Sequence, residues 1–281
     1  MALRNKGQVP HQLVMTATPI PRTLTMTLYA DMAVSLIDEL PSGRQPIETR
    51  AIADSRRDEV IDRVRRALSG GGQAYWVCPL IEDSEHLDLA AAQPTAEMLG
   101  KVLPGQTVGL LHGRMPGSQK AEVMQAFKAG HIQVLVATTV IEVGVDVPNA
   151  NLMIIENPER MGLAQLHQLR GRVGRGSARS HCILLYKSPL GANARARLQV
   201  IRDSQDGFYI AEQDLKLRGG GELLGTRQTG DQSFRLADLR RHAHLIPEAV
   251  ARGDALLSTA PDSVQTLLDA WAPLDTGHIS V

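Results

Sequence analysis

The residues with the clearest chemical potential are Gln168, Arg172 and Arg175, in the segment QLRGRVGR at 168–175. On one helix, spacings of three and four residues would place all three side chains on the same face. Two guanidiniums aimed at one point suit a polyphosphate and can neutralise charge on a phosphoryl group during its transfer. The alternative interpretation is a basic helix surface whose arginines pair with acids or water.

A second polar segment, TATP at 16–19, follows an apolar run that reads as a strand. The hydroxyls of Thr16 and Thr18 are placed to relay hydrogen bonds between a hydrolysis site and its surroundings. Threonine is common at strand ends, so this segment alone is a weak signal.

A third polar segment, ATTVIEVGVDVP at 137–148, follows another buried strand. Its hydroxyls and free backbone groups can hold phosphates of a nucleic acid strand. Asp146 can accept a hydrogen bond from a ribose hydroxyl or orient an arginine. On their own, Glu142 and Asp146 fit solvated loop acids better.

The elements that must position these residues alternate along the chain. We expect strands at 47–53, 73–78, 108–111, 132–137, 151–155 and 181–186, and helices at 55–68 (capped by Ser55), 95–102, 118–129 and 162–169. Continuous apolar strands alternating with helices predict an α/β fold with a parallel sheet covered on both faces. Ligands of such sheets gather at the carboxyl ends of the strands, where we expect the site.

The flanking segments differ from this alternating pattern. The sequence predicts a strand at 13–18 and a helix at 21–29, then a connector rich in proline and glycine. After the last strand come two helices at 192–202 and 207–217 and a glycine-rich loop at 218–230. The rest, from 233 on, is mostly helical with breaks at Pro247, Pro261 and Pro273.

Charge and cysteine usage narrow the class of protein. The 281 residues carry no net charge, but the segment from 160 to 241 holds fifteen Lys/Arg against seven Asp/Glu, a net of +8. This suggests a local contact with a polyanion, although ordinary surface charge would look the same. Cys78 and Cys182 lie in apolar runs and predict buried free thiols in a reducing cytoplasm, without structural zinc. The sequence contains no run of 18 apolar residues, so it predicts no membrane span.

Taken together, four segments resemble the motifs of superfamily 2 helicases, in the same order. TAT at 16–18 resembles motif III, and LHGRM at 111–115 resembles motif IV. The 137–148 segment resembles motif V, and 168–175 resembles motif VI. Four matches in order at sensible spacing make a specific signal.

The resemblance narrows further at the carboxyl-terminal side. GFYIAEQDLKLR at 207–218, with GELLG at 221–225 and QTG at 228–230, resembles the TRG element shared by the RecG and Mfd families. YAD at 29–31, IDELP at 37–41 and the tail around 234–247 resemble RecG rather than Mfd. One departure is Gly220, which stands where the family loop has proline and predicts a looser loop.

The resemblance to RecG covers essentially the whole chain and implies its domain organisation. Residues 1–40 would be the end of the first RecA-like lobe and a linker, and residues 41–190 the second RecA-like lobe. Residues 191–232 would be the helical translocation hairpin and its loop, followed by a helical tail at 233–281. The implied fold is thus a RecA-like parallel sheet with helices on both faces, then helices.

The resemblance also implies an activity, ATP-driven translocation on double-stranded DNA that remodels stalled forks and Holliday junctions in repair and recombination. Arg172 and Arg175 would contact the γ-phosphate, with Gln168 placing them. ATP would also be bound by Gly144 and Asp146. DNA binding or coupling would fall to Thr16, Thr18, Thr138, Thr139, Glu142, Arg202, Arg218, Glu222 and Gln228.

The sequence lacks two elements that such enzymes need, a GxxxxGK[ST] phosphate loop and a DExH box. We therefore expect a carboxyl-terminal fragment that is inactive alone, with ATP and Mg²⁺ held mainly by a missing lobe and no metal site of its own. The expected partner is branched double-stranded DNA, bound by a monomer in the bacterial cytoplasm, near the nucleoid and away from membranes.

Two alternatives remain open at this point. The first is an Mfd-like translocase that couples transcription to repair. The second is a DNA-binding or partner-binding module without catalysis, which the +8 segment favours. A nuclease fits less well, because no cluster of metal-binding carboxylates stands out in the sequence.

Overall fold

The computed structural model describes residues 13, 15, 35, 37, 45–79, 88–138, 146–176, 178–218 and 242–271. By its internal contacts the chain divides into two compact units, and 45–218 belongs to the first while 242–271 belongs to the second. Of the strand expected at 13–18, only Leu13 and Met15 are described. Both are exposed and outside any strand, and no described strand offers them a partner. The glycine-rich loop lies outside the described residues beyond 218.

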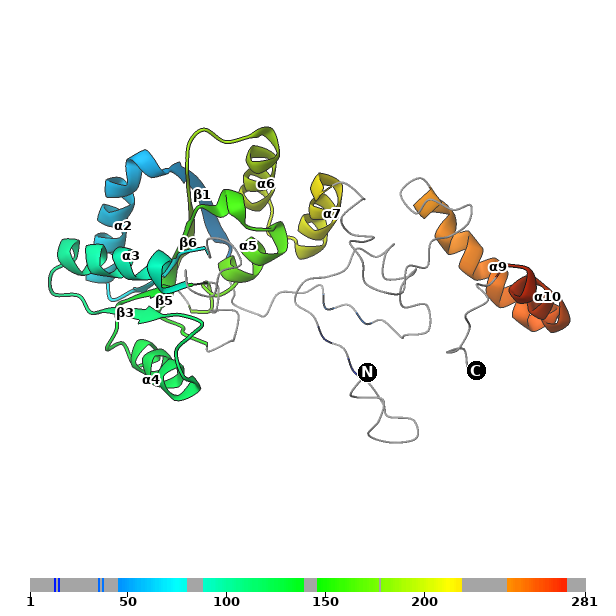
Figure 1. Ribbon diagram of the computed structural model, residues 1–281, viewed down its shortest axis with the longest axis horizontal. Coiled ribbons are helices and arrows are strands. Elements are labelled where there is room, and N and C mark those ends of the chain that lie inside the picture. Colours follow the sequence, from blue (N-terminus) through cyan, green and yellow to red (C-terminus); the bar gives the residue numbers. More distant parts are fainter. Residues whose placement is uncertain are drawn as a thin grey trace. The chain divides into compact units, whose positions relative to one another are not determined.

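The first unit is built on one sheet of six strands, all paired in parallel (Figure 1). The strands are β1 (Ile47–Ala53), β2 (Gln73–Val77), β3 (Val108–Leu111), β4 (Val134–Ala137), β5 (Ala150–Glu156) and β6 (Ser180–Tyr186). Their order across the sheet is β1-β6-β5-β2-β4-β3. The predicted α/β class is confirmed, and the six predicted strands are present with bounds shifted by at most two residues.

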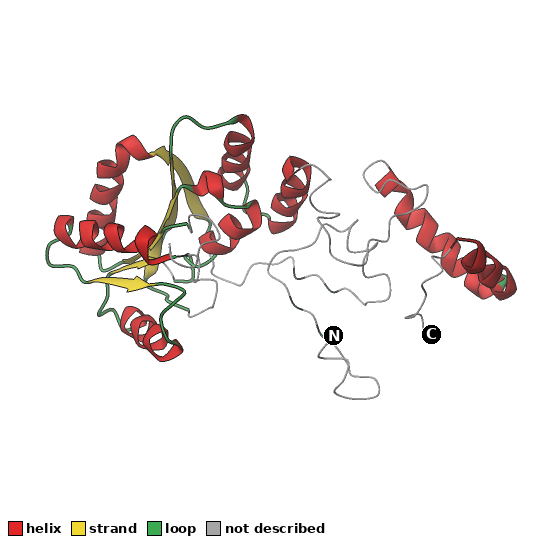
Figure 2. Ribbon diagram, viewed as in Figure 1, coloured by secondary structure: helices red, strands yellow, loops and turns green. Residues whose placement is uncertain are grey.

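Helices cover both faces of this sheet (Figure 2). They are α2 (Arg57–Ser69), α3 (Asp88–Val102), α4 (Gly117–Lys128), α5 (Leu163–Arg170), α6 (Ala192–Asp203) and α7 (Gly207–Arg218). One apolar core joins α2 and α3 to the sheet, and the other joins α4, α5, α6 and α7 to its opposite face.

The strands alternate between these two cores. On β2, Trp76 points into the α2 side while Tyr75 points into the other, and every residue of β2 is buried. A strand buried on both faces must be apolar at almost every position, which is why it reads as a continuous apolar run. Cys78 and Cys182 are free and buried, as predicted, and burial raises the pKa of each thiol to about 12.

The start of α2 differs from the prediction. Ser55 does not cap the helix but lies in a 3₁₀ turn, η2 (Asp54–Arg56), and α2 begins at Arg57 without a side-chain cap. Instead the guanidinium of Arg56 donates two hydrogen bonds, of 2.7 and 2.6 Å, to the carboxylate of Glu59. The negative charge of Glu59 in the first turn also favours the positive end of the helix dipole.

The third helix is longer than predicted. α3 begins at Asp88, seven residues before the expected start at Thr95, and continues through Pro94. Proline disfavours a helix interior, which is why the sequence suggested a later start. Ala92 from the added segment is fully buried in the core beside α2, and such packing overrides local propensity.

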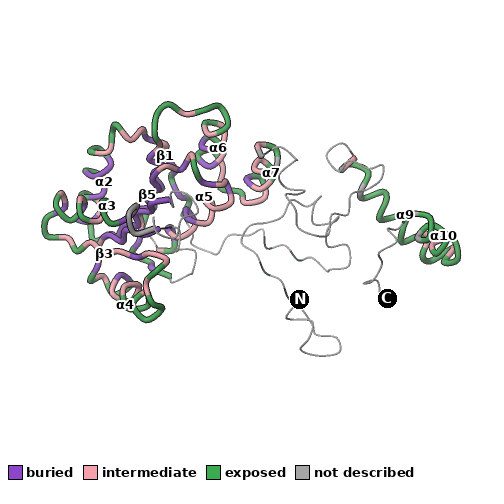
Figure 3. Tube along the Cα trace, in the orientation of Figure 1, coloured by how far each residue is buried: buried purple, intermediate pink, exposed green. Residues whose placement is uncertain are grey.

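The second unit comprises a 3₁₀ turn, η5 (Ala243–Leu245), and two helices, α9 (Ile246–Thr259) and α10 (Pro261–Trp271). Most described residues of α9 and α10 are exposed (Figure 3). Pro261 begins α10, whereas Pro247 lies in the first turn of α9 and does not break it. A helix tolerates proline there because that turn's N–H groups have no partner in the helix anyway. None of the described helices is long and apolar enough to cross a membrane.

Candidate active site

The helix that carries the glutamine of QLRGRVGR ends before either of the two expected catalytic arginines. α5 stops at Arg170, Gly171 caps it, and Arg172 and Arg175 follow in the turn. The expectation that the glutamine and both arginines share one helix face is therefore wrong. Glycine is a poor helix former, and Gly174 adopts the left-handed φ of +80°, which a helix cannot include.

This turn, residues 171–176, is called here the arginine loop, and it lies at the amino-terminal edge of the sheet. A Cβ on Gly174 would lie 2.9 Å from Cγ1 of Ile47, the first residue of β1, and one on Gly176 would overlap the carbonyl oxygen of Pro148, just before β5. The expectation of a site at the carboxyl ends of the strands is wrong for these arginines. A helix between parallel strands must return the chain to the edge where strands begin.

Asp146 faces the arginine loop from the segment before β5. Nη1 of Arg175 lies 3.6 Å from Oδ1 of Asp146, and the two side chains are 34% and 58% exposed. Nε of Arg175 also donates to the carbonyl of Gly171 at 3.4 Å. An ion pair this exposed contributes less than about 1 kcal/mol, so it can orient the guanidinium without sequestering it. The orienting role of Asp146 remains a prediction that this geometry suits.

Charges of the loop converge near the phenol of Tyr75 on β2. Burial raises the pKa of Tyr75 to about 12, while the positive charges of Arg172 and Arg175 oppose that rise and Asp146 adds to it. All three charges therefore act on one buried group. Gln168 lies half-buried on α5, four residues before Arg172 in the sequence.

Arg170, which sequence reasoning did not single out, is the most buried arginine of the segment at 2% exposure. Its Nη1 donates to the carbonyls of Ile201 at 2.5 Å and Ser204 at 2.8 Å, and more weakly to Oγ1 of Thr49 at 3.5 Å. Its Nη2 donates to Nδ1 of His167 at 2.9 Å. Burial lowers the pKa of this guanidinium. Arg170 thereby fixes α5 to the last turn of α6, whose carbonyls favour a positive charge.

A second arginine that sequence reasoning missed, Arg197 in the middle of α6, fixes that helix to the residues before α5. Arg197 donates to the carbonyl of Glu159 at 2.7 Å and to that of Met161 at 3.1 Å, just before α5. The burial of Arg170 could have been predicted from the sequence. Arg170 lies seven residues after buried Leu163, on the helix face that the apolar residues define.

Among the described residues predicted to contact nucleic acid, Thr138 is the one that is buried at the carboxyl end of a strand. Its backbone N–H donates to the carbonyl of Leu111 at 3.1 Å, which joins the ends of β3 and β4. Oγ1 of Thr138 and Nδ1 of His112 are buried and make no hydrogen bond within the described part of the chain. Buried polar atoms are rarely left unpaired, so this edge of the sheet can accept hydrogen bonds from or donate them to an incoming group.

Two more of the predicted site residues, Arg202 and Arg218, are among the described ones. Arg202, in the last turn of α6, is exposed and pairs with the carboxylate of Asp203 at 2.7 Å. Arg218 is the last residue of α7. The predicted residues that lie outside the described ones are Thr16, Thr18, Thr139, Glu142, Gly144, Glu222 and Gln228, together with Gly220.

The described residues include no group of three or more His, Cys, Asp or Glu side chains that could hold a metal ion. The arginine loop itself contains two arginines and no carboxylate, and Asp146 pairs with Arg175 from outside it. The loop therefore supplies positive charge, which suits a phosphate group rather than a cation.

The chain is similar to known proteins over almost all of its length. Residues 57–177 match the helicase conserved C-terminal domain, and residues 204–268 match domain 3, C-terminal, of the ATP-dependent DNA helicase RecG. RecG of Escherichia coli O157:H7 is 60% identical over 278 residues, which cover 97% of this chain and 40% of that protein. RecG of Bacillus subtilis is 46% identical over 262 residues, which cover 93% and 38%.

A solved structure of RecG bound to a three-way DNA junction matches with a TM-score of 0.65 at 46% identity, covering 82% of this chain and 30% of that one. The chain spans about 40% of the length of the curated relatives it matches. Its parallel sheet with helices on both faces is the RecA-like fold of a helicase second lobe. The chain belongs to the RecG family of ATP-dependent DNA helicases.

Proposed function

We propose that this chain is the carboxyl-terminal part of an ATP-dependent helicase that translocates on double-stranded DNA and remodels stalled forks and Holliday junctions. The observation that carries the proposal is the arginine loop at the amino edge of a RecA-like sheet, where Arg175 pairs with Asp146 and Arg172 precedes it in the same turn. The relatives bear the name of ATP-dependent DNA helicases, and one was solved with a three-way DNA junction. The proposed setting is the bacterial cytoplasm, with the chain acting as a monomer on chromosomal DNA.

The proposed chemistry is stabilisation of charge on the γ-phosphate of ATP. Arg172 and Arg175 would reach that phosphate from this lobe, and Gln168 would position them. Arginines in this role accelerate phosphoryl transfer by about 10³ to 10⁵. The sequence contains no phosphate loop and no DExH box, so the first RecA-like lobe would supply the cradle for ATP and Mg²⁺. Within this lobe, Gly144 and Asp146 are the residues proposed to bind the nucleotide.

The proposed coupling between ATP binding and movement on DNA runs from the arginine loop to the helices that follow it. Arg170 ties α5 to the last turn of α6, and Arg197 ties α6 to the residues before α5. α7 packs against both α5 and α6. When the loop engages ATP, α6 and α7 would therefore move with it as one body. The exposed side chain of Arg202, with Arg218, Glu222 and Gln228, is proposed to pass that motion to DNA.

The proposed DNA contacts lie at the opposite edge of the sheet. Thr138 and His112 leave two buried polar atoms unpaired there. Thr16, Thr18, Thr139 and Glu142 are proposed to extend this contact to the phosphate backbone. Contacts of this kind make binding depend on salt and little on sequence.

A test of the proposal is a chimera in which this chain replaces the matching 40% of RecG from Escherichia coli O157:H7. We expect the chimera to hydrolyse ATP in a DNA-dependent manner and to unwind a model fork. The isolated 281-residue chain should do neither, because half of the site is absent. DNA-stimulated ATPase activity of the isolated chain, absent from its Arg172→Ala variant, would contradict the proposed division of the site.

A second candidate function is a DNA-binding module without catalysis. The observation in its favour is the excess of eight positive charges between residues 160 and 241. If the chimera shows no ATPase activity while the isolated chain binds duplex DNA, and that binding survives loss of both Arg172 and Arg175, this second function is favoured. The match of residues 204–268 to RecG domain 3 and the RecG relatives set the Mfd-like alternative aside.

A further inference from the structure

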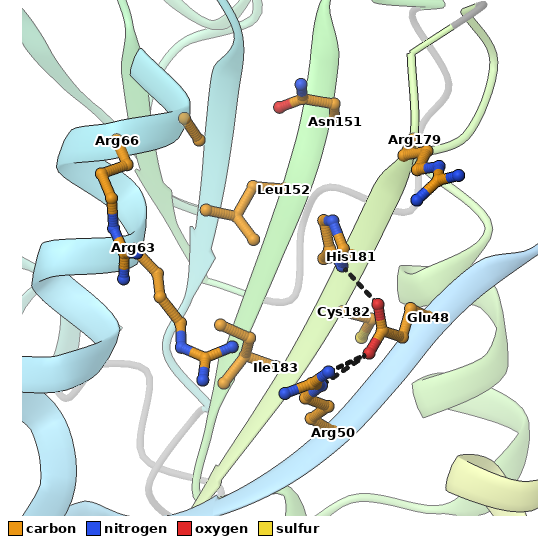
Figure 4. A pocket seen from close by; sticks show the side chains of 11 residues that line it. Glu48, Arg50, Arg63, Arg66, Asn151, Leu152, Arg179, His181, Cys182 and Ile183 are labelled. Atoms are coloured by element: carbon orange, nitrogen blue, oxygen red, sulfur yellow. Dashed lines mark hydrogen bonds and ion pairs between the residues drawn. The ribbon is translucent and has the colours of Figure 1, made fainter. Parts of the chain in front are cut away.

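A basic groove with a volume of about 480 Å³ lies on the α2 side of the sheet, at its amino-terminal edge (Figure 4). Four arginines from three elements line it, namely Arg50 of β1, Arg63 and Arg66 of α2, and Arg179 just before β6. In Figure 4, Arg63 extends from α2 over Ile183, and Arg179 lies on the opposite side of the groove. The groove is thus a separate feature from Thr138 at the carboxyl edge.

Among the described residues, Glu48 is the only acidic side chain that lines the groove, and its charge is already engaged. Its carboxylate accepts a hydrogen bond of 2.6 Å from Nε of Arg50 and lies 3.2 Å from Nδ1 of His181. The hydrogen bond from Arg50, with the charges of Arg50, His181 and Arg63, lowers the pKa of Glu48. Glu48 is therefore ionised at neutral pH and balances Arg50.

The other three guanidiniums form no direct salt bridge with a carboxylate among the described residues. Nε of Arg66 donates to the backbone carbonyl of Asp62 at 3.3 Å, which leaves its charge uncompensated. Arg63 and Arg179 form no hydrogen bond or salt bridge with a described residue, although the charge of Arg63 is near enough to Glu48 and Glu59 to lower the pKa of both carboxyls. Three like charges around one groove repel each other, so binding an anion there is favourable.

The floor and the walls of the groove indicate which anion fits. Leu152 and Ile183 form an apolar floor, while Arg66 and Arg179 are exposed at its rim. A guanidinium can bind two oxygens of one phosphate at once, and the apolar floor suits the sugar between phosphates. A shallow groove with exposed arginines on both walls suits a polymer backbone better than an enclosed small molecule.

We propose that this groove binds backbone phosphates of a duplex DNA arm, as a second DNA contact on the face of the lobe that carries α2. The proposal rests on the proposed function, since it assumes that the chain acts on DNA. It adds a contact that none of the helicase-like motifs contains, because Arg50, Arg63, Arg66 and Arg179 all lie outside the segments that resemble them.

The test is a salt titration of duplex DNA binding by the 281-residue chain, followed by fluorescence anisotropy. The variant Arg63→Gln/Arg179→Gln removes two unpaired guanidiniums from the groove. Since each phosphate contact contributes about 0.9 to the slope of log K against log salt concentration, we expect that slope to become less steep by about 2. Affinity should fall similarly for duplexes of different sequence, because backbone contacts carry no base readout.

The matched control is Arg56→Gln/Arg65→Gln, which makes the same change in net charge on and beside the same helix. Both control arginines are paired outside the groove, Arg56 with Glu59 and Arg65 with Asp62. The control should keep the slope of the unchanged chain. An unchanged slope in the groove variant, or an equal loss in the control, overturns the proposal. If Arg63→Gln lowers the melting temperature, Arg66→Gln/Arg179→Gln repeats the test with exposed residues only.

Further measurements distinguish DNA from other anions that could bind the groove. They also distinguish a failure of the groove proposal from a failure of the proposed function. If inorganic phosphate at millimolar concentration competes equally with the chain and the groove variant, the groove is not the DNA contact. If the groove variant loses binding to a polyglutamate peptide but keeps the DNA slope, the groove belongs to an acidic protein segment, and the DNA assignment is overturned. No binding of duplex DNA by the unchanged chain contradicts the DNA contacts of both proposals, whereas binding with an unaltered slope contradicts the groove alone.

Discussion

Arg170 and Arg175 belong to one eight-residue segment, yet the structure gives them opposite environments. Arg170 is 2% exposed and donates to four polar atoms within 3.5 Å, on Thr49, His167, Ile201 and Ser204. Arg175 is 34% exposed and forms one ion pair at 3.6 Å and one long hydrogen bond. Burial, and not the type of residue, separates a guanidinium that holds the fold from one that can reach a ligand.

The change between these environments happens within five residues because the helix ends between them. α5 keeps Arg170 on its buried face, and Gly171 ends the helix before Arg172. The same short segment can therefore serve packing at its start and chemistry at its end.

Replacing either loop arginine should abolish activity while leaving the fold intact. In the chimera with Escherichia coli RecG, we expect Arg172→Ala and Arg175→Ala each to lower the rate of ATP hydrolysis by about 10³ or more. Both side chains are only partly buried, so the melting temperature should stay within a few degrees of the parent. A loss of less than tenfold in both variants would contradict the proposed contact with the γ-phosphate.

Replacing Arg170, unlike replacing the loop arginines, should lower the stability of the fold. Arg170→Met leaves the carbonyls of Ile201 and Ser204 unpaired, which we expect to cost about 3 kcal/mol of unfolding free energy. For a unit of this size that lowers the melting temperature by roughly 10 °C, as measured by circular dichroism. Arg202→Met is the control, because Arg202 is exposed and should change stability by no more than about 0.5 kcal/mol. Equal melting temperatures for the two variants would show that Arg170 is not a structural clamp.

The shape of the arginine loop should depend on Gly174. We expect Gly174→Ala to destabilise the fold by about 1–2 kcal/mol, because alanine is strained at φ +80° and its Cβ would meet Ile47. Gly130→Ala is the control, since it shares that φ of +80° but has nothing within 4 Å. The difference between the two unfolding free energies isolates the contact with Ile47, and no difference would mean that Ile47 moves aside at no cost.

The smallest expected effect is that of the acid facing the loop. Asp146→Asn should lower ATPase activity of the chimera by about fivefold or less, since an ion pair this exposed contributes under about 1 kcal/mol. The deficit should shrink as salt is added, because salt screens such a pair. A loss as large as that of Arg175→Ala would mean that Asp146 contacts the nucleotide directly.

Most of the fold could be predicted from the sequence because its strands are buried on both faces. The run from Gln73 to Val77 is apolar after its first residue, and glycines precede it, so both its type and its bounds were clear. Helix starts were harder to predict. Ser55 looked like a cap, but it lies in a 3₁₀ turn, and Arg56 of that turn pairs with Glu59 in the first turn of α2. The start of α3 was predicted too late, because the burial of Ala92 against distant residues outweighs Pro94.

The candidate site was predicted in part. The sequence singled out Gln168, Arg172, Arg175 and Asp146, and the structure brings the two arginines and Asp146 to one edge of the sheet. The sequence analysis placed that group at the wrong edge of the sheet. The general rule for parallel sheets does not say at which edge the side chains of a particular connection lie. The clamp made by Arg170 was missed, since its acceptors are backbone carbonyls some 30 residues away, and any sequence has these.

Ordered motifs and continuous apolar runs are local properties of the chain, so the family and the alternation of strands and helices could be read from them. The tertiary structure alone decided which guanidinium is buried, which pairs weakly at the surface, and which gather around the groove beside α2. Those outcomes depend on neighbours that folding brings together, and the free energy of a charge depends on those neighbours far more than on the residue that carries it.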